Sequence, residues 1–564
     1  MLALSPVLLV GAGTGEATCG ILYLASYLRR HGIEAYVRLT DADESEAEVT
    51  RSLERLVAHV RPRLVGISLK WFHHVARAKV IAKALKKIDP KVQVAIGGNT
   101  ATYFCKELLG WDSIDHVILG DGEVPLLALC RGDASPPNVV NRGSPKQAHG
   151  YVDGTAKGDV YYSHFDELFL SQLDLHSFSG WVAPGKGCGE NCLYCGGTRG
   201  MQKATFGRAR PFLRPVESVQ RDHREIVPRT WQLRYDFAGS TAAFLEDTWK
   251  GVDLSRHATT YFLWGVPPPE LAETLAAHFQ RVYMVLDIGC FSESQRQETM
   301  RRGLLKPCPS DAELFEVIDR CRRHPNLQLE ISGIAGLPFA SRATLAQEHR
   351  LVDRVLGLGC SIGYQRLEAQ PGALVTEHPE RFEMTTEAKT FTEFLDYFER
   401  LEPSERTVPM VRFDDAALEE AVQRTSDEID AKVWAHAAKR REVAVDGKTR
   451  LVNAAVSTQE FALGTWLGSW RVPARVTQEK VTVVRSIDGT GLSCAPSVSP
   501  RKFSDPLLQQ GEDGAALLDV LAAFERPTTV NTALRQLEKK PRFDPESARE
   551  VIDHLTEGRF LQPG

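Results

Sequence analysis

Two long stretches of this chain alternate short apolar runs with amphipathic helical patterns, and this alternation limits the possible folds more than any other feature. Within the first 150 residues, helical patterns separate apolar runs at positions 7–10, 35–37, 64–68, 92–98 and 116–119. Six further runs follow between residues 178 and 365. Strands that alternate with helices form parallel sheets, whose ligands lie at the carboxyl ends of the strands. The sequence therefore predicts an α/β protein with two such units.

At 564 residues the chain is long enough for several domains. We expect a doubly wound, Rossmann-like domain at residues 1–150, joined by a linker to an open parallel barrel of six strand–helix units at 176–400, whose active groups lie at its C-terminal face. For residues 401–564 we expect a small α+β accessory domain. Within it, the predicted order of three helices and a strand over residues 511–564 resembles a winged helix. Acidic residues outnumber basic ones in that tail, which argues against nucleic-acid binding.

The net charge of −5 gives no general case for a nucleic-acid or membrane partner, and no apolar run reaches membrane-spanning length. The N-terminus lacks a basic region before its first apolar run, so it is not expected to be a signal peptide. Most of the eleven cysteines stand singly in apolar contexts, as buried thiols do in a reducing compartment. We therefore expect a cytoplasmic protein with no nucleic-acid or membrane partner.

Three cysteines, Cys188, Cys192 and Cys195, stand in a glycine-rich loop with the spacing C-x3-C-x2-C. Three thiolates suit three irons of a [4Fe–4S] cluster and leave the fourth iron open for a small molecule. A structural zinc site would need a fourth protein ligand from elsewhere in the chain. Three incidental thiols are the remaining interpretation.

This loop, with Tyr194 directly before the third cysteine, resembles that of the radical S-adenosylmethionine (SAM) superfamily. Three later segments are similar to landmarks of that family: 289–303, 333–338 and 367–372. The resemblance implies that SAM chelates the open iron and contacts Tyr194, Gly239, Ser240, Ser292, Arg302, Gly333 and Gly336. Local structure would also account for several of these positions: a turn at Gly239, a helix cap at Ser292 and a solvated charge at Arg302.

Glycine-rich strand ends in the first domain, together with segment 20–32, resemble the cobalamin-binding domain that precedes many radical SAM domains. The resemblance implies cobalamin contacts at Gly13, Thr14, Ser68, Leu69, Lys70, Gly97, Gly98, Gly120, Gly122 and Glu123. The D-x-H-x-x-G motif that supplies an axial histidine in many cobalamin proteins is absent, so the lower face of the corrin would meet another group, such as Ser68, Leu69 or Lys70. We expect His73 and His74 to be a solvated helix start.

Two other interpretations of the first domain remain. A nicotinamide dinucleotide would need the pattern G-x-G-x-x-G, in which Glu16 occupies the last glycine position. Alternatively, the domain binds no ligand and serves only as a scaffold.

Three side chains are candidates for catalysis in the barrel. Tyr235 and Asp236 end the second predicted barrel strand. Glu273 follows a run of prolines after the third strand, where an acidic residue would also suit the first turn of a helix.

The resemblance as a whole implies a cobalamin-dependent radical SAM C-methyltransferase. It would move a methyl group from SAM via methylcobalamin to a carbon of a biosynthetic intermediate or a peptide, with an electron donor such as flavodoxin or ferredoxin. The alternatives are another radical SAM reaction (cyclisation, rearrangement or epimerisation), methylation of an aromatic carbon by a non-radical route, and an iron–sulfur redox sensor without catalytic activity.

Overall fold

The structure is a computed structural model of the 564-residue chain. It describes residues 5–13, 18–40, 44–142, 157–168, 179–208, 210–230, 232–235, 241–401, 408–441, 450–453, 455–462, 466–467, 470–471, 480–486, 507–510, 516, 519–524, 526, 528–540, 545–557 and 561–563. No helix within these ranges is both long and apolar enough to cross a bilayer.

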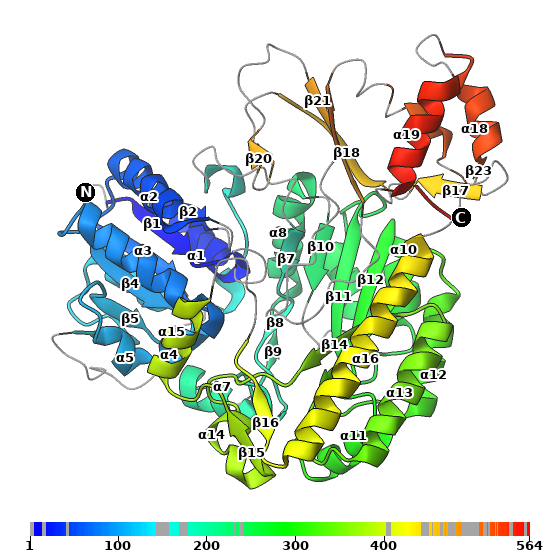
Figure 1. The fold of residues 1–564 in the computed structure, drawn as a ribbon. Coiled ribbons are helices and arrows are strands. Elements are labelled where there is room, and N and C mark those ends of the chain that lie inside the picture. The colour runs from blue at the N-terminus through cyan, green and yellow to red at the C-terminus, as the bar shows by residue number, and fades with distance from the viewer. Residues whose placement is uncertain are drawn as a thin grey trace.

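The N-terminal domain is a six-stranded sheet with the order β2-β1-β3-β4-β5-β6 (Figure 1). Its strands are β1 (Val7–Gly11), β2 (Ala35–Leu39), β3 (Leu64–Ser68), β4 (Gln93–Gly97), β5 (His116–Ile118) and β6 (Val139–Asn141). The first five pair in parallel, as predicted, while β6 was not predicted and adds an antiparallel edge. Its helices are α1 (Thr18–Arg30), α2 (Glu46–Val60), α3 (Val75–Ile88), α4 (Asn99–Tyr103), α5 (Cys105–Leu109) and α6 (Glu123–Arg131).

The central domain is a second parallel sheet whose spatial order, β7-β10-β11-β12-β13-β14, follows the order of its strands along the chain. The strands are β7 (Ser179–Val182), β10 (Gln232–Tyr235), β11 (Ala258–Trp264), β12 (Arg281–Asp287), β13 (Leu327–Ala335) and β14 (Ser361–Arg366). Strands β7 and β14 are not neighbours, so among the described residues the sheet remains an open barrel. The predicted α/β fold class is confirmed.

The helices of the barrel alternate with its strands and cover its outer face (Figure 1). They are α7 (Arg199–Phe206), α8 (Val216–Ile226), α9 (Ala242–Trp249), α10 (Leu271–His278), α11 (Glu293–Arg301), α12 (Asp311–Arg322) and α13 (Arg342–Gly357). Several begin at a side-chain cap, for example Ser310, whose hydroxyl accepts from the backbone N–H of Glu313 while Glu313 bonds back to the Ser310 N–H. This reciprocal arrangement satisfies donors that the first helical turn leaves without partners.

The segment after the last barrel strand returns to the N-terminal domain. Helix α14 (Leu374–Glu377) is followed by α15 (Phe391–Arg400). The residues of α15 were predicted to belong to the barrel domain, but this helix packs on α3 and on the short helix Phe72–His74 of the N-terminal domain. The rings of Phe391 and Phe394 lie 5.1 and 5.3 Å from those of Phe104 and Phe72. The two domains therefore share one apolar core around α15.

The long helix α16 (Ala416–Arg441) runs beside β14 and α13 (Figure 1). A small sheet, β23-β17-β24, combines β17 (Arg450–Asn453) with β23 (Thr528–Thr529) and β24 (Leu561–Pro563), and helices α18 (Val530–Leu537) and α19 (Pro545–Glu557) belong to the same unit. Its apolar core includes Phe524, Ile552 and Leu561. The winged-helix character of this tail stays a prediction.

Candidate active site at the cysteine loop

The three cysteines of the C-x3-C-x2-C loop lie between β7 and α7, at the carboxyl end of the first barrel strand. Each sulfur accepts a backbone N–H. Glu190 donates to Cys188 at 3.4 Å, Gly197 to Cys195 at 3.2 Å, and Lys306 to Cys192 at 3.3 Å. Hydrogen bonds to sulfur stabilise thiolates and tune the potential of a cluster that they hold. The donor set thus fits an iron–sulfur cluster bound through three cysteines.

Burial, opposed by the Gly197 N–H and assisted by the nearby Cys192 and Cys188, raises the pKa of Cys195 to about 12. Burial also raises the pKa of Cys192. Without a metal these thiols keep their protons at neutral pH, so cluster binding must displace them. Across the described ranges, no three His, Cys, Asp or Glu side chains already surround a common point as ligands of an ion would.

The side chain of Lys306 is a functional candidate that the sequence analysis missed. It is 1% exposed, its ammonium donates to the Tyr194 hydroxyl at 2.9 Å, and it pairs with Asp287 at 2.9 Å. Burial alone would lower the pKa of Lys306, but Asp287 and Tyr194 raise it well above its usual value. The positive charge of Lys306 is close enough to Cys192 to oppose the rise in the pKa of that thiol. The available signal was a lysine between Leu305 and Pro307, since lysine is almost never buried without a partner.

The described part of the barrel's inner face contains an aromatic cluster and the guanidinium of Arg234. Trp181, Phe262, Tyr283 and Val285 form a buried cluster separate from the side chains that face the helices. The rings of Trp181 and Phe262 stack with centroids 5.9 Å apart, and the guanidinium of Arg234 lies 4.3 Å from the Trp181 ring. Trp264, at the end of β11, is 39% exposed and pairs in register with Asp287. An aromatic wall thus extends from the inner face to the mouth near the cysteine loop.

The predicted catalytic roles of Tyr235 and Glu273 are not supported by their positions. Tyr235 is 0% exposed and points toward the helices, where its hydroxyl lies 2.8 Å from His223 Nε2 and accepts from Trp249 Nε1 at 3.0 Å. Successive residues of a strand face opposite sides, so Arg234 faces inward and Tyr235 outward. Glu273 is exposed to solvent on α10. Asp236 lies outside the described residues.

Most of the predicted SAM contacts have structural partners of their own. The Ser292 hydroxyl caps α11 through the Gln295 N–H at 3.3 Å and donates to Gln347 at 2.8 Å. The side chain of Arg302 is 48% exposed and pairs with Glu298 at 2.6 Å. Ser292 thus serves as a helix cap and Arg302 forms a surface ion pair, and their contact with SAM stays a prediction.

The two glycines predicted to contact SAM are explained by packing and by backbone conformation. A Cβ at Gly333 would lie 2.8 Å from the ring of Phe291, and Gly336 has φ +83°, which favours glycine. Among the described members of the predicted SAM set, only Tyr194 lies in the cysteine loop. Gly239 and Ser240 lie outside the described residues.

The predicted cobalamin contacts gather at one edge of the N-terminal sheet. The strand ends pair in register there, Gly11 with Ser68 and Ser68 with Gly97. A Cβ at Gly98 (φ +113°) would lie 2.5 Å from the Leu69 carbonyl oxygen, so only glycine lets these two loops pack. The Gly120 N–H donates to Thr102 at 3.0 Å. Thr14 lies outside the described residues.

His73 and His74 are not a solvated helix start, contrary to expectation. Their Nδ1 atoms, and Nε1 of Trp71, are buried and have no hydrogen-bond partner. Burial lowers the pKa of His74 to about 4 and lowers that of His73 well below its usual value. The His74 ring lies directly against Gly13, where a Cβ would be 2.4 Å from its Nε2. Orphaned ring nitrogens at this edge fit a polar ligand that the strand ends would hold.

An ionic cluster joins the loop after β5 to the cysteine loop. Lys186, just ahead of Cys188, pairs with Glu123 at 2.7 Å and with Asp121 at 3.2 Å, and Arg208 also pairs with Asp121. Burial would lower the pKa of Lys186, but Glu123 and Asp121 raise it above its usual value. Glu123, predicted to contact cobalamin, thus binds the barrel domain. We call these four residues the interdomain ionic cluster.

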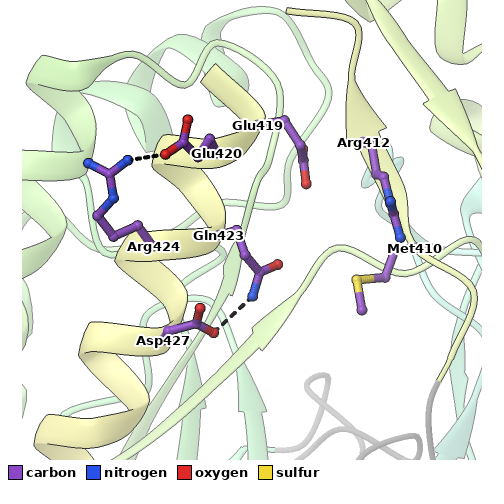
Figure 2. A pocket seen from close by; sticks show the side chains of 7 residues that line it. All are labelled: Met410, Arg412, Glu419, Glu420, Gln423, Arg424 and Asp427. Atoms are coloured by element: carbon purple, nitrogen blue, oxygen red, sulfur yellow. Dashed lines mark hydrogen bonds and ion pairs between the residues drawn. The ribbon is translucent and has the colours of Figure 1, made fainter. Parts of the chain in front are cut away.

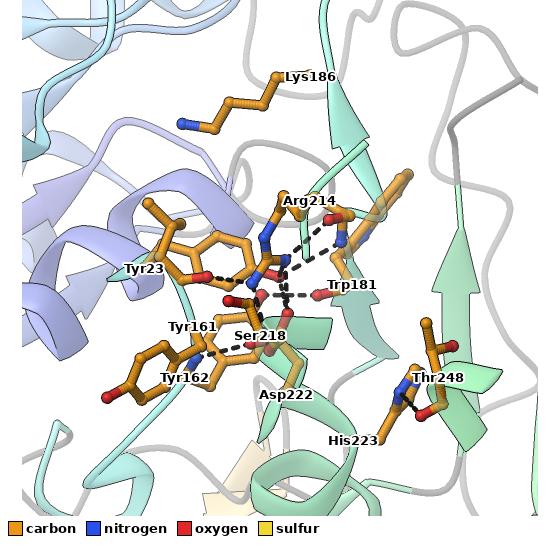
Figure 3. A network of polar contacts seen from close by, with 12 residues as sticks. Tyr23, Tyr161, Tyr162, Trp181, Lys186, Arg214, Ser218, Asp222, His223 and Thr248 are labelled. Atoms are coloured by element: carbon orange, nitrogen blue, oxygen red, sulfur yellow. Dashed lines mark hydrogen bonds and ion pairs between the residues drawn. The ribbon is translucent and has the colours of Figure 1, made fainter. Parts of the chain in front are cut away.

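A second polar network joins α1 to α8 (Figure 3). The Tyr23 hydroxyl and the Arg214 guanidinium donate to Asp222 at 2.6 and 2.7 Å, and the Tyr162 N–H donates to its other oxygen at 2.7 Å. The Arg214 and Asp222 side chains are 1% and 0% exposed. Tyr162 continues the network to the backbone of Trp181, on the inner wall of the barrel, at 2.6 Å. This network was not predicted from the sequence.

A polar cavity of about 420 Å³ lies between α16 and the strand β16 (Val411–Phe413) (Figure 2). Its charged side chains are paired: Arg424 with Glu420 at 2.6 Å, and Glu419 with Arg366 at 2.6 Å. Gln423 donates to Asp427 at 2.8 Å. These side chains already form ion pairs and hydrogen bonds with protein groups, which leaves them less able to bind a ligand in the cavity. The cysteine loop therefore remains the candidate site.

Comparison with known proteins agrees with this geometry. Residues 6–130 match the family described as the B12 binding domain. The chain is 28% identical over 191 residues to the hopanoid C-3 methylase of Methylococcus capsulatus, an alignment that covers 31% of this chain and 35% of that protein. The matched region thus spans about a third of the length of this curated relative.

Two solved structures have the same overall fold. The radical S-adenosylmethionine methyltransferase TsrM from Kitasatospora setae, with cobalamin and a [4Fe-4S] cluster bound, superposes with a TM-score of 0.56 at 14% identity, covering 75% of this chain and 90% of that one. The cobalamin-dependent S-adenosylmethionine radical enzyme OxsB, with aqua-cobalamin bound, gives 0.54 at 10% identity, covering 78% and 68%. The predicted resemblance to cobalamin-dependent radical SAM enzymes is confirmed at the level of the fold.

Proposed function

We propose that this chain is a cobalamin-dependent radical SAM C-methyltransferase that binds a [4Fe–4S] cluster, SAM and cobalamin. The observation that carries the proposal is the juxtaposition of two sites. A loop of three cysteines, each capped by an N–H donor, adjoins the interdomain ionic cluster that ties it to the loops of a B12-binding domain. When bound, the iron–sulfur cluster and cobalamin supply electron transfer to SAM and methyl transfer to carbon.

In this proposal the chain's own residues position and enclose the reactants. Cys188, Cys192 and Cys195 would hold three irons, and the Lys306 ammonium, fixed by Asp287, would lie beside them as a buried positive charge. Such a charge favours an anionic group nearby, such as the carboxylate of SAM or of the substrate. Tyr194 limits the movement of that ammonium, which reduces the reorganisation that binding requires.

The aromatic wall supports a substrate with a flat or apolar part. Trp264 offers a partly exposed ring at the mouth, and Trp181 and Phe262 line the inner face. This wall also favours the second candidate function, methylation of an aromatic carbon without a substrate radical. A biosynthetic intermediate and a peptide both remain within the proposed substrate class, and we propose a low-potential protein electron donor as partner.

Anaerobic purification followed by reconstitution with iron and sulfide tests the proposal. We expect about four irons per chain and retention of added hydroxocobalamin through gel filtration. Reduction in the presence of SAM should give 5′-deoxyadenosine and S-adenosylhomocysteine if the radical route operates, and S-adenosylhomocysteine alone if the aromatic route does.

Alanine variants of single cysteines test which cysteines bind the cluster. Cys188→Ala, Cys192→Ala and Cys195→Ala should each lose the cluster, whereas Cys321→Ala, a buried thiol of α12, should keep it. A cluster retained in any of the three loop variants would contradict the ligand set. A reconstituted protein that cleaves SAM but never retains cobalamin would contradict the methyltransferase proposal and leave another radical SAM reaction.

A further inference from the structure

His74 lies where the exit loops of β1 and β3 meet. Ala12 donates its N–H to the Ser68 carbonyl at 3.3 Å, which fixes the two loops against each other. The imidazole of His74 then covers Gly13, whose missing side chain makes room for it. The position is at the carboxyl ends of the strands, which is the ligand edge of a doubly wound sheet.

The Nδ1 atom of this imidazole is buried and has no hydrogen-bond partner among the described residues. The side chain also makes no cap bond to α3, of which His74 is the N-cap residue. A buried ring nitrogen without a partner carries the cost of its lost contact with water. A ligand that accepts the nitrogen lone pair would remove this cost.

Two of the residues predicted at this edge, Leu69 and Lys70, offer no comparable ligand atom. Leu69 has an apolar side chain, and the Lys70 ammonium lies 5.1 Å from the ring of Trp71, where it serves as a cation rather than a donor of electrons. His73 turns toward the core, with its ring 6.5 Å from that of Phe398 on α15. Neutral imidazole is the commonest protein ligand of transition metals, and burial keeps His74 neutral at physiological pH.

We propose that an imidazole nitrogen of His74 is the lower axial ligand of cobalt when cobalamin is bound. A histidine from the β3 exit loop would thus replace the one that the absent D-x-H-x-x-G motif provides from the β1 loop. The proposal rests on the cobalamin binding proposed above. It also explains why Gly13 must lack a side chain, since a Cβ there would displace the ring.

Electron paramagnetic resonance of bound cob(II)alamin tests this assignment directly. Full-length protein with natural histidine and with ¹⁵N-labelled histidine would be loaded with hydroxocobalamin and reduced to cob(II)alamin. Ligation by His74 predicts a triplet splitting of the high-field cobalt lines that becomes a doublet on labelling. The nitrogen of the cofactor's own benzimidazole would stay a triplet, and a water ligand would give no splitting.

Variants locate the ligand and separate this proposal from the proposed function. His74→Gln should abolish the doublet, the matched control His73→Gln should keep it, and Gly13→Ala should weaken it by displacing an unchanged imidazole. A bound cobalt signal without a doublet, or a doublet that survives in His74→Gln, would overturn the assignment while cobalamin binding stands. Absence of any bound cobalt signal would overturn both.

Discussion

Replacing Lys186 by methionine tests whether the interdomain ionic cluster holds the cysteine loop against the B12-binding domain. The variant keeps most of the side-chain volume but removes the ammonium that lies 2.7 Å from Glu123 and 3.2 Å from Asp121. Arg208 still pairs with Asp121, whereas the Glu123 carboxylate, whose side chain is only 5% exposed, loses its cation. Removing one partner of a buried pair costs about 3–5 kcal/mol, since the other charge remains in a low dielectric.

A loss of that size is readily measured by thermal melting. At roughly 2–4 °C per kcal/mol for a domain of 150–250 residues, Lys186→Met should lower the melting temperature by about 6–20 °C. Lys250→Met is a matched control, because Lys250 pairs with Asp247 at 2.6 Å but its side chain is 71% exposed. An exposed pair contributes about 0–1 kcal/mol, so this control should melt within a few degrees of wild type.

The double variant Lys186→Met/Glu123→Gln distinguishes a buried charge from general damage. Glutamine neutralises the stranded carboxylate, so the double variant should recover more than half of the lost stability. Methyl transfer by Lys186→Met should fall further than its iron and cobalamin contents, because the two sites would no longer be held in register. The reasoning is refuted if Lys186→Met melts like Lys250→Met, or if the double variant is less stable than the single one.

Three further predictions test individual side chains. Burial raises the pKa of Glu348 to about 7. Between about pH 4.5 and 7 the folded protein therefore binds more protons than the unfolded chain. Its free energy of unfolding falls by about 3 kcal/mol as the pH rises through that window. In urea denaturation, Glu348→Gln should therefore be about 3 kcal/mol more stable relative to wild type at pH 8 than at pH 5, and an equal difference at both would contradict it. Gly333→Ala should lower the free energy of unfolding by about 1–3 kcal/mol through its clash with Phe291 at 2.8 Å, with Gly357→Ala, which meets nothing within 4 Å, as the control. Glu273→Gln should leave product formation unchanged, and a loss above about tenfold in a correctly folded variant would restore Glu273 as a catalytic candidate.

The sequence predicted the two parallel sheets because their strands and helices have clear local signals. The runs at residues 64–68 and 282–286 are continuously apolar or nearly so, and such runs are typical of strands that are buried on both faces. The cysteine loop was equally visible, because three ligands of one cluster come from a single loop. These predictions depended on local pattern and spacing alone.

The individual side chains were harder to predict because their roles depend on distant parts of the chain. Lys306 lies beside Cys192, which is far away in sequence, and the half-buried His74 ring lies against Gly13 in the β1 exit loop. The side of the sheet that Tyr235 faces was predicted wrongly, since a shift by one residue along a strand exchanges the inner and outer faces. Ser292 shows a different limit, because a serine at a helix start can cap the helix as well as bind a ligand.

The polar contacts between the two domains bear on how their orientation is fixed. Arg214 and Asp222 are fully buried together with the Tyr23 hydroxyl, and removing both charges from water costs several kcal/mol that their attraction does not fully return. Apolar side chains of similar volume would stabilise the same contact at least as well, but they would tolerate sliding between α1 and α8. Directional bonds to Asp222 from Tyr23, Arg214 and the Tyr162 backbone accept one arrangement. We therefore infer that these charges specify the geometry between the two ligand edges, as methyl transfer between two cofactors would require.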